Sequence, residues 1–320
     1  MTILLLGAGG QLGWELGAGL SSLDRVLHFG RKQADLSRLD DLEALVKKTR
    51  PKVIVNAAAH TKVDQAEEEP DLAMLVNAEA PARLAALAKE LDAWLVHYSS
   101  DYVYDGRKDG VYLESDPTAP LNVYGRSKLA GDEAIMKSGC RHLIFRTSWV
   151  FSESGQNFPR TILELARRED EMSIVSDQYG SPTGVELLAG ATALALHQAL
   201  ESQNDLSGLY NLVASGYTNW HGFAVYLVQR ALELGWGLLA KPEKIKTRLS
   251  QQSGRKAARP ANSRLSTEKF RSTFHLNPGP WQYYVDRLLW VWTRAYGASV
   301  GPPKHILGLR LLPPVNEDLV

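Results

Sequence analysis

Cysteine is nearly absent from this sequence, which holds one, Cys140, among 320 residues. A single cysteine cannot form an intramolecular disulfide or a CxxC metal site, and its rarity is typical of proteins in a reducing compartment. The 8 histidines form no HExxH or similar pattern, which argues against a catalytic metal. These absences exclude a disulfide-rich secreted domain and favour chemistry that uses neither a cysteine nor a histidine-bound metal.

Long hydrophobic runs and an excess of either charge are also missing. The most apolar later stretch, residues 187–196, is about ten residues long, which is too short to span a bilayer. The apolar start, Thr2–Leu6, lacks the basic flank of a secretory signal. Lysine plus arginine equals aspartate plus glutamate at 36 each, so no global field recruits nucleic acid or an anionic membrane. The sequence predicts a cytoplasmic protein without nucleic-acid or membrane partners.

What the sequence does contain is an alternation of short apolar runs and helical patterns, typical of βαβ units around a parallel sheet. A first domain over residues 1–150 is expected to be an α/β, Rossmann-type, doubly wound parallel sheet. Its strands are predicted at residues 3–6, 26–29, 53–56, 94–99 and 143–147, and its helices at 11–20, 39–49, 81–91 and 124–137.

A smaller C-terminal α/β domain is predicted over residues 151–296, and part of residues 177–212 is expected to return to the first domain. Its helices are predicted at 158–168, 186–199, 220–234 and 281–296, with strands at 173–175 and 209–212. Residues 297–320 contain two Pro-Pro pairs and are predicted to form an extended or disordered tail.

A glycine-rich turn joins the first predicted strand to the first helix. Gly7, Gly10 and Gly13 are spaced GxxGxxG, which lets a backbone turn tightly and bring its amides to a diphosphate at a helix N-terminus. Arg31 follows the second strand, and no carboxylate lies between that strand and Asp35. A basic side chain there accommodates a ribose 2′-phosphate. The sequence therefore predicts dinucleotide binding, with NADPH favoured and NADH left as an alternative.

Tyr124 and Lys128 stand four residues apart where a helix is predicted to begin, which places both side chains on one face. An ammonium beside a phenol favours phenolate, so the pKa of Tyr124 is expected to fall toward neutrality. Tyr104 and Lys108 share this spacing, but the turn at Asp105-Gly106 breaks their common face. Tyr124 is therefore predicted to protonate a carbonyl oxygen as hydride reaches the carbon.

Polar and aromatic residues follow two later strands. Ser100 and Asp101 come directly after residues 94–99, at the sheet edge where open α/β folds bind ligands. The Ser100 hydroxyl is expected to bind the substrate oxygen that Tyr124 protonates. Trp149 closes the next strand, where an indole either stacks on a sugar or packs as a core aromatic.

Together these motifs resemble the extended short-chain dehydrogenase/reductase superfamily, and within it the chain is similar to the dTDP-4-dehydrorhamnose reductases. The blocks that carry this similarity are residues 10–16, 55–61, 98–104, 120–125, 145–150, 177–183 and 259–265. The resemblance implies a cytoplasmic oxidoreductase that uses NADPH to reduce the C4 ketone of dTDP-4-dehydro-β-L-rhamnose. The product would be dTDP-β-L-rhamnose, in the last step of dTDP-L-rhamnose biosynthesis for lipopolysaccharide O-antigen.

The resemblance also implies residue roles. Ser100, Tyr124 and Lys128 form the catalytic triad, in which Lys128 holds the nicotinamide ribose. The implied cofactor contacts are Gly7, Gly10, Gln11 and Leu12 at the pyrophosphate, Arg31, Asp35 and Leu36 at the adenosine side, and Ala59, His60 and Thr61 along the dinucleotide, together with Tyr124 and Lys128. The implied sugar contacts are Ser100, Asp101 and Trp149.

Two segments depart from the family pattern. Where relatives carry a tyrosine- and proline-rich segment, this chain has residues 251–258. Three basic side chains in or beside that segment are still expected to face a diphosphate, namely Arg255, Lys256 and Arg259. Some relatives dimerise around magnesium held by glutamates, and Glu15 and Glu186 match two of those positions. The final helix offers residues 290–292 where a third would sit, so the metal and a homodimer stay open.

Three alternatives stay open. A non-catalytic NADP-binding regulatory subunit, as in methionine adenosyltransferase, resembles these reductases, but retention of Ser100, Tyr124 and Lys128 favours an enzyme. A nucleotide-sugar dehydratase or epimerase needs further acid and base groups, and the Asp-Glu pair of the dehydratases is absent after Ser100. A reductase of a related nucleotide 4-keto-sugar, with the opposite C4 configuration, is the third.

Overall fold

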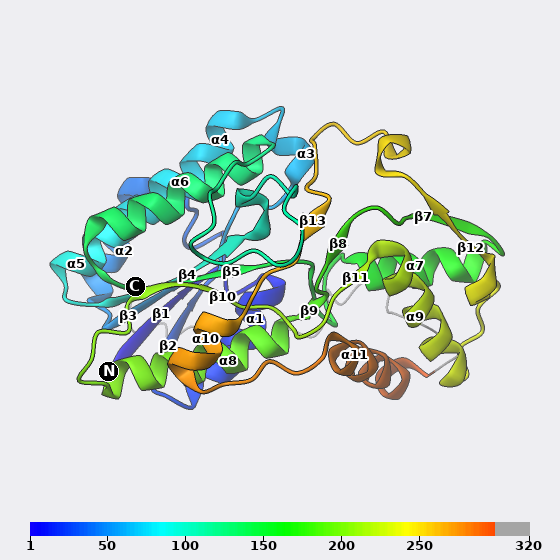
Figure 1. The fold of residues 1–320 in the computed structure, drawn as a ribbon. Helices are drawn as coiled ribbons and strands as arrows, with labels where there is room; N and C mark the ends of the chain where they lie inside the picture. The colour runs from blue at the N-terminus through cyan, green and yellow to red at the C-terminus, as the bar shows by residue number, and fades with distance from the viewer. Residues whose placement is uncertain (298–320) are drawn as a thin grey trace.

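A six-stranded parallel sheet forms the centre of the computed structural model, which describes residues 1–297 (Figure 1). Its strands lie in the order β10-β5-β4-β3-β1-β2, and every neighbouring pair is parallel. They are β1 (Thr2–Leu6), β2 (Arg25–Phe29), β3 (Val53–Asn56), β4 (Trp94–Ser100), β5 (Arg141–Thr147) and β10 (Gly208–Asn211). The strand order reverses between β1 and β3, the position where open α/β sheets bind ligands.

Helices cover both faces of this sheet. One face packs on α1 (Gln11–Ser21), α8 (Val185–Glu201) and α10 (Glu268–Phe274). The other packs on α2 (Leu39–Thr49), α5 (Ala80–Glu90) and α6 (Val123–Ser138). Strands buried on both faces need continuous apolar runs, which explains β1 and β3. The predicted Rossmann-type doubly wound sheet is confirmed.

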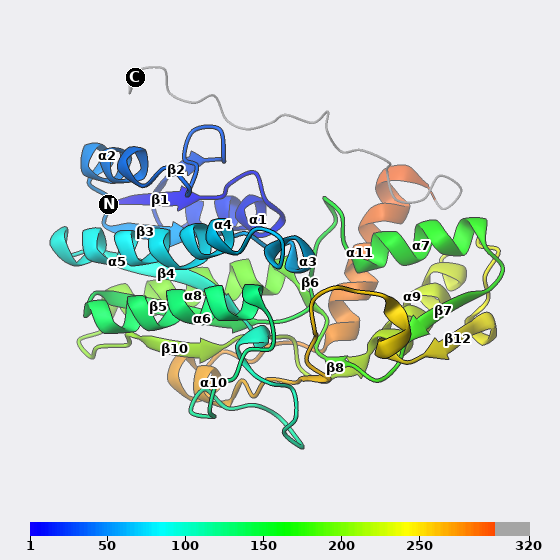
Figure 2. The same cartoon turned by 90° about the horizontal axis from the view of Figure 1, so that it is seen from above.

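A second group of elements shares its own apolar core and lies beyond the carboxyl ends of the large sheet's strands (Figure 2). It comprises α7 (Phe158–Arg168), β7 (Met172–Val175), α9 (Trp220–Glu233), β12 (Ile245–Arg248) and α11 (Trp281–Tyr296). β7 and β12 pair in parallel. The division of the chain into a cofactor-binding and a substrate-binding domain stays a prediction.

Several short elements were not predicted. Between β3 and α5 lie α3 (Val63–Ala66), α4 (Pro70–Met74) and the π-helix η1 (Leu75–Glu79), followed after β4 by the 3-10 helix η2 (Asp101–Val103). The short strands are β6 (Val150–Phe151), β8 (Tyr179–Gly180), β9 (Thr183–Gly184), β11 (Thr218–Asn219) and β13 (Asn262–Ser263). Two further 3-10 helices are η3 (Pro242–Lys244) and η4 (Ser250–Ser253).

The predicted tail lies outside the described residues except for Gly297, which follows α11. Among residues 1–297, no helix combines the length and the apolar character needed to cross a bilayer.

Substituting Gly13 by alanine is expected to damage the turn before α1. A Cβ at Gly13 would lie 2.1 Å from the Gly7 carbonyl oxygen, so helix and turn must separate, at a cost of about 1–3 kcal/mol for overpacking. A Cβ at Gly9 would meet no atom within 4 Å. We expect Gly13→Ala, and not Gly9→Ala, to lower the melting temperature of the ligand-free protein. Equal melting temperatures for the two variants would contradict this role of Gly13.

Candidate active site

The start of α6 brings Tyr124 to the end of β4. Asn122 caps the helix, since its Oδ1 accepts a hydrogen bond from the Gly125 amide at 2.7 Å. A Cβ on Gly125 would lie 2.2 Å from the Tyr102 carbonyl oxygen, so the close approach of α6 to η2 requires glycine. The rings of Tyr102 and Tyr124 consequently meet edge to face, with centroids 5.6 Å apart.

Ser100 and Tyr124 are brought together as predicted. Burial raises the pKa of Tyr124 to about 12, and a hydrogen bond with the Ser100 side chain opposes that shift. The Ser100 hydroxyl donates to Asp101 Oδ1 at 3.0 Å and accepts from the Tyr102 amide at 3.1 Å. The prediction of a lowered pKa for Tyr124 is wrong for the ligand-free chain. Tyr124 is therefore protonated at neutral pH, as a proton donor must be.

Lys128 is almost fully buried, at 1% exposure, and its Nζ binds groups on β4. It donates to the Tyr98 carbonyl oxygen at 2.6 Å and lies 3.1 Å from His97 Nε2. Burial lowers the pKa of Lys128 to about 8, while Asp132 acts in the opposite direction. These contacts explain the failed prediction for Tyr124, because the cation is held against β4 and its own charged form is disfavoured.

A buried ion pair adjoins Lys128 and was not predicted. Asp132, one turn further along α6, accepts from Arg146 Nε at 3.1 Å and from the Ser99 hydroxyl at 2.8 Å. Arg146 also donates to the Tyr104 hydroxyl at 2.8 Å. The side chains of Asp132 and Arg146 are 0% and 3% exposed, so the two charges compensate each other and water contributes little.

Asp101 is buried with one oxygen unpaired. Oδ1 accepts from Ser100, whereas Oδ2 has no hydrogen-bond partner in the structure. Burial raises the pKa of Asp101 to about 6, although the Ser263 and Ser100 side chains oppose the change. A buried carboxylate oxygen without a donor is costly, and it is suited to accept a hydroxyl group of a ligand.

We expect Asp101→Asn to stabilise the ligand-free protein in a pH-dependent way. A raised pKa in the folded state makes ionisation unfavourable for folding, so the cost is absent below the ordinary pKa of 3.8 and complete above about 6. The gain at pH 8 should be about 2–3 kcal/mol, and it should vanish at pH 3.5. Urea unfolding at both pH values measures it.

Asp105→Asn is the matched control, because a backbone hydrogen bond from Arg107 lowers the pKa of Asp105. That variant should gain nothing at pH 8. An equal gain for both substitutions, or a gain for Asp101→Asn that persists at pH 3.5, would overturn the assignment.

The turn before α1 has the backbone geometry that the predicted cradle requires. Gly7 has φ +79, and the N-cap of α1 is Gly10, without a side-chain cap. Because no side chain satisfies the first amides of α1, they suit a pyrophosphate, and the open space beside Gly9 leaves room for it. The Gln11 side chain instead faces the segment after β6, accepting from the Ser152 hydroxyl at 2.9 Å. Leu12 packs partly into the core.

The predicted cofactor contacts after β2 and β3 lie at the same end of the sheet. Asp35 accepts from Arg31 Nε at 3.2 Å and from the Ser37 hydroxyl at 2.8 Å. The Arg31 side chain is 81% exposed and pairs with Asp35 through Nε, so its guanidinium can also meet a phosphate. Leu36 is buried in the core, so its side chain faces away from solvent.

The loop Ala59-His60-Thr61 is held by the π-helix η1. Asn77, within η1, accepts from the His60 amide at 2.8 Å and donates to the His60 carbonyl at 3.0 Å. It also donates to the Ser127 hydroxyl on α6 at 3.0 Å. π-Helical turns often occur at functional sites, and this one fixes the loop relative to the helix that carries Tyr124 and Lys128.

Trp149 has a left-handed backbone, with φ 48, which is rare for a bulky residue and marks strain near functional sites. Its ring stacks on Trp220, with centroids 3.6 Å apart and planes 10° from parallel. The indole is half-buried. Trp149 thus packs on one face, as one interpretation predicted, and remains partly accessible.

Two of the basic residues at 255–259 pair with carboxylates in and just after α3. Arg259 forms a bidentate salt bridge with Asp64, with nitrogen to oxygen distances of 2.8 and 2.7 Å. Lys256 forms a salt bridge with Glu68. Arg255 remains exposed. Lys256 and Arg259 are thus paired with carboxylates, and the expectation that the three basic residues face a diphosphate stays a prediction.

Glu15 and Glu186 do converge, together with Glu153. Burial raises the pKa of Glu15 and of Glu186, and the neighbouring carboxylates reinforce the shift. A guanidinium meets them, since Arg287 Nε lies 3.3 Å from Glu186 Oε1. Within residues 1–297, no three His, Cys, Asp or Glu side chains assemble into a group able to hold a metal. The question of a magnesium ion between two copies stays open.

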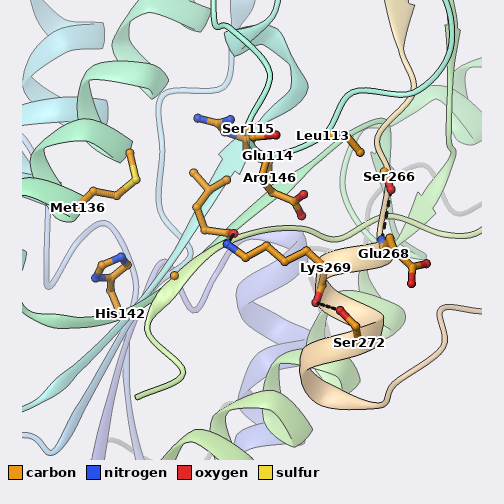
Figure 3. A pocket seen from close by; sticks show the side chains of 12 residues that line it. Leu113, Glu114, Ser115, Met136, His142, Arg146, Ser266, Glu268, Lys269 and Ser272 are labelled. Carbon is orange, nitrogen blue, oxygen red and sulfur yellow. Dashed lines mark hydrogen bonds between the residues drawn. The ribbon is translucent and has the colours of Figure 1, made fainter. Parts of the chain in front are cut away.

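A cavity of about 750 Å³ opens at the edge strand β10, away from Tyr124 (Figure 3). Lys269 reaches into it from α10 and donates to the Leu209 carbonyl at 2.9 Å. Glu114 accepts from the Asn211 amide at 2.7 Å. These two side chains occupy outward backbone groups of β10, which hinders strand addition at this edge. Ser100, Tyr124 and Lys128 do not line this cavity.

Comparison with known proteins matches residues 1–294 to the family described as RmlD substrate binding domain. The dTDP-4-dehydrorhamnose reductase of Escherichia coli is 46% identical over 294 residues, covering 90% of this chain and 97% of that protein. The enzyme of Burkholderia thailandensis is 42% identical over 288 residues, covering 89% and 97%. The crystal structure of the Bacillus anthracis reductase in complex with NADP is 30% identical, with a TM-score of 0.81 and coverage of 91% and 99%.

Proposed function

This chain belongs to the dTDP-4-dehydrorhamnose reductase family, and on that basis we propose that it reduces the C4 ketone of dTDP-4-dehydro-β-L-rhamnose to dTDP-β-L-rhamnose with NADPH. The observation that carries the proposal is the placement of Tyr124 against Ser100, beside buried Lys128, at the carboxyl end of β4. That edge of the sheet is also where the glycine cradle of α1 lies.

Tyr124 is the proposed acid. Its phenol is protonated because burial raises its pKa to about 12, and proton loss becomes favourable only as negative charge develops on the ketone oxygen beside it. The Ser100 hydroxyl orients that oxygen. Lys128 supplies positive charge on the same face of α6, which stabilises the phenolate left after proton transfer.

NADPH, when bound, supplies the hydride that reduces C4. The amides of Gly10, Gln11 and Leu12 would hold its pyrophosphate at the α1 N-terminus, and the exposed Arg31 would meet the 2′-phosphate. Ala59, His60 and Thr61 would line the dinucleotide, and Gly7 provides the tight turn. NADP in the Bacillus anthracis reductase supports this choice, with NADH as the alternative.

The sugar is proposed to bind between Asp101 and Trp149. The unpaired Asp101 Oδ2 would accept a hydrogen bond from a sugar hydroxyl, and the exposed part of the half-buried Trp149 indole would contact the sugar ring. Exposed Arg255 is the remaining basic residue for the diphosphate. A cytoplasmic location and a homodimer belong to the same proposal.

The test is NADPH oxidation with the dTDP keto-sugar, followed by NMR of the product. We expect substrate-dependent oxidation and the rhamno configuration at C4. The opposite configuration would identify a reductase of a related 4-keto-sugar. Binding of NADPH without turnover of any keto-sugar nucleotide would identify a regulatory subunit and overturn the proposal.

A further inference from the structure

His97 lies between Lys128 and Asn56. It belongs to neither the glycine-rich turn nor the Tyr124–Lys128 pair. It is 1% exposed on β4 and is the direct register partner of Asn56 on β3. Its Nε2 is 3.1 Å from Lys128 Nζ, and its Nδ1 is 3.2 Å from Asn56 Nδ2. An imidazole with both nitrogens engaged by fixed partners has its proton position set by those partners.

Asn56 decides which nitrogen of His97 carries the proton. The Ala58 backbone amide, which can only donate, faces Asn56 Oδ1 at 3.2 Å, so the oxygen of the Asn56 amide must be on that side. The NH₂ group is thereby directed at His97 Nδ1. Since NH₂ also only donates, Nδ1 must accept, and the proton of neutral His97 lies on Nε2.

We propose that His97 is a positioning residue for Lys128: held by Asn56 in the Nε2–H tautomer, it donates to the lysine nitrogen and favours the uncharged amine until a cofactor binds. This inference rests on the proposed function, because the cofactor is taken to be NADPH. A charged Lys128 has no lone pair to accept this hydrogen bond, so one of its N–H groups would point at the Nε2–H of His97. When ribose hydroxyls provide acceptors, Lys128 takes up a proton from solvent and becomes the ammonium that the reaction uses.

The charged groups around Lys128 are consistent with this proton uptake. Asp132 on α6 favours the charged lysine, but Arg146 on β5 neutralises that carboxylate. From β4, Tyr98 offers its carbonyl oxygen to Lys128, and its own phenol is directed away, to Thr192 on α8. Tyr124 on α6 stays protonated. Burial holds the pKa of His97 well below its ordinary value, so the ring is neutral.

Nitrogen-15 NMR of the histidine rings tests the tautomer directly and without any ligand. Selective labelling of the full chain at pH 8 should show His97 with Nε2 protonated and Nδ1 bare. The His97→Gln variant identifies the signal by its loss. An Nδ1–H tautomer or a doubly protonated ring would overturn the proposal, whatever the enzyme does.

Calorimetry of NADPH binding in buffers of different ionisation enthalpy tests the proton uptake. With the Lys128 pKa at about 8, wild type should take up about half a proton per NADPH at pH 8. Asn56→Asp can only accept, which moves the proton to Nδ1 and turns Nε2 into an acceptor for the ammonium. Its uptake should be near zero, and that of Lys128→Met should also be near zero.

Uptake by Lys128→Met equal to that of wild type would assign the proton elsewhere and overturn the proposal, as would undiminished uptake by Asn56→Asp. Thermal melting first establishes that each variant is folded, and if one is not, the ring tautomer of wild type decides alone. Failure of NADPH to bind wild type would instead contradict the proposed function and leave the tautomer result standing.

Discussion

Replacing Tyr124 by phenylalanine is expected to lower kcat by about 10²–10⁴-fold, the usual contribution of a positioned general acid. The ring remains, so its edge-to-face contact with Tyr102 and the packing of α6 should persist. NADPH affinity should change by less than about threefold, because the lost hydroxyl acts in the transition state and contributes little to ground-state binding. Stopped-flow measurement of NADPH absorbance with the keto-sugar, together with NADPH titration, measures both.

Tyr226→Phe is the matched control. The Tyr226 hydroxyl also makes a polar contact, donating to Asp286 at 3.0 Å, but it lies on α9, away from β4. This variant should keep kcat within about twofold, as is usual for a surface substitution of small energetic effect. If Tyr124→Phe retained wild-type kcat, another group would have to be the acid.

Replacing Arg146 by methionine is expected to lower the free energy of unfolding by about 3–5 kcal/mol. Asp132 would be left buried without its cation, since only Ser99 would still donate to the carboxylate. Burial already raises the pKa of Asp132, and removal of Arg146 would raise it further. The loss should therefore be greatest at pH 8 and shrink as the pH falls and folded Asp132 becomes protonated. Urea unfolding at pH 8 and pH 5 measures the difference.

Arg141→Met on the same strand is the control for that experiment. Arg141 pairs with Asp92 at 2.9 Å, but the two side chains are 44% and 83% exposed. An exposed pair contributes about 0–1 kcal/mol. Asp132→Asn combined with Arg146→Met should recover part of the stability, because the buried charge is removed. Equal losses for Arg141→Met and Arg146→Met would contradict the account of the buried pair.

The large sheet could be predicted from the sequence because its strands are short apolar runs and its helices have a clear period. β3 was predicted at its observed bounds, and α2 likewise. The segment between β3 and α5 was missed, since α3 has only four residues and α4 five, too few for a periodic pattern. The short strands β8, β11 and β13 pair across large sequence separations, which local composition does not encode.

Part of the site was predictable from the order of strands and helices along the chain. Strand ends at one sheet edge correctly placed Ser100 near Tyr124. The pKa of Tyr124 was predicted in the wrong direction because burial, a property of the whole fold, exceeds the effect of a cation on the same helix. His97 stood in an apolar strand and gave no sign of its partners, which come from α6 and β3.

The central claim is that this chain transfers hydride to C4 while Tyr124 supplies the proton. The most direct test uses NADPH deuterated at the transferable C4 position, with the dTDP keto-sugar as substrate and NMR of the product. We predict one deuterium on C4 of a rhamno product from the wild type, and little product from Tyr124→Phe. Consumption of NADPH with no deuterium on the sugar, or full labelled product from Tyr124→Phe, would contradict the account.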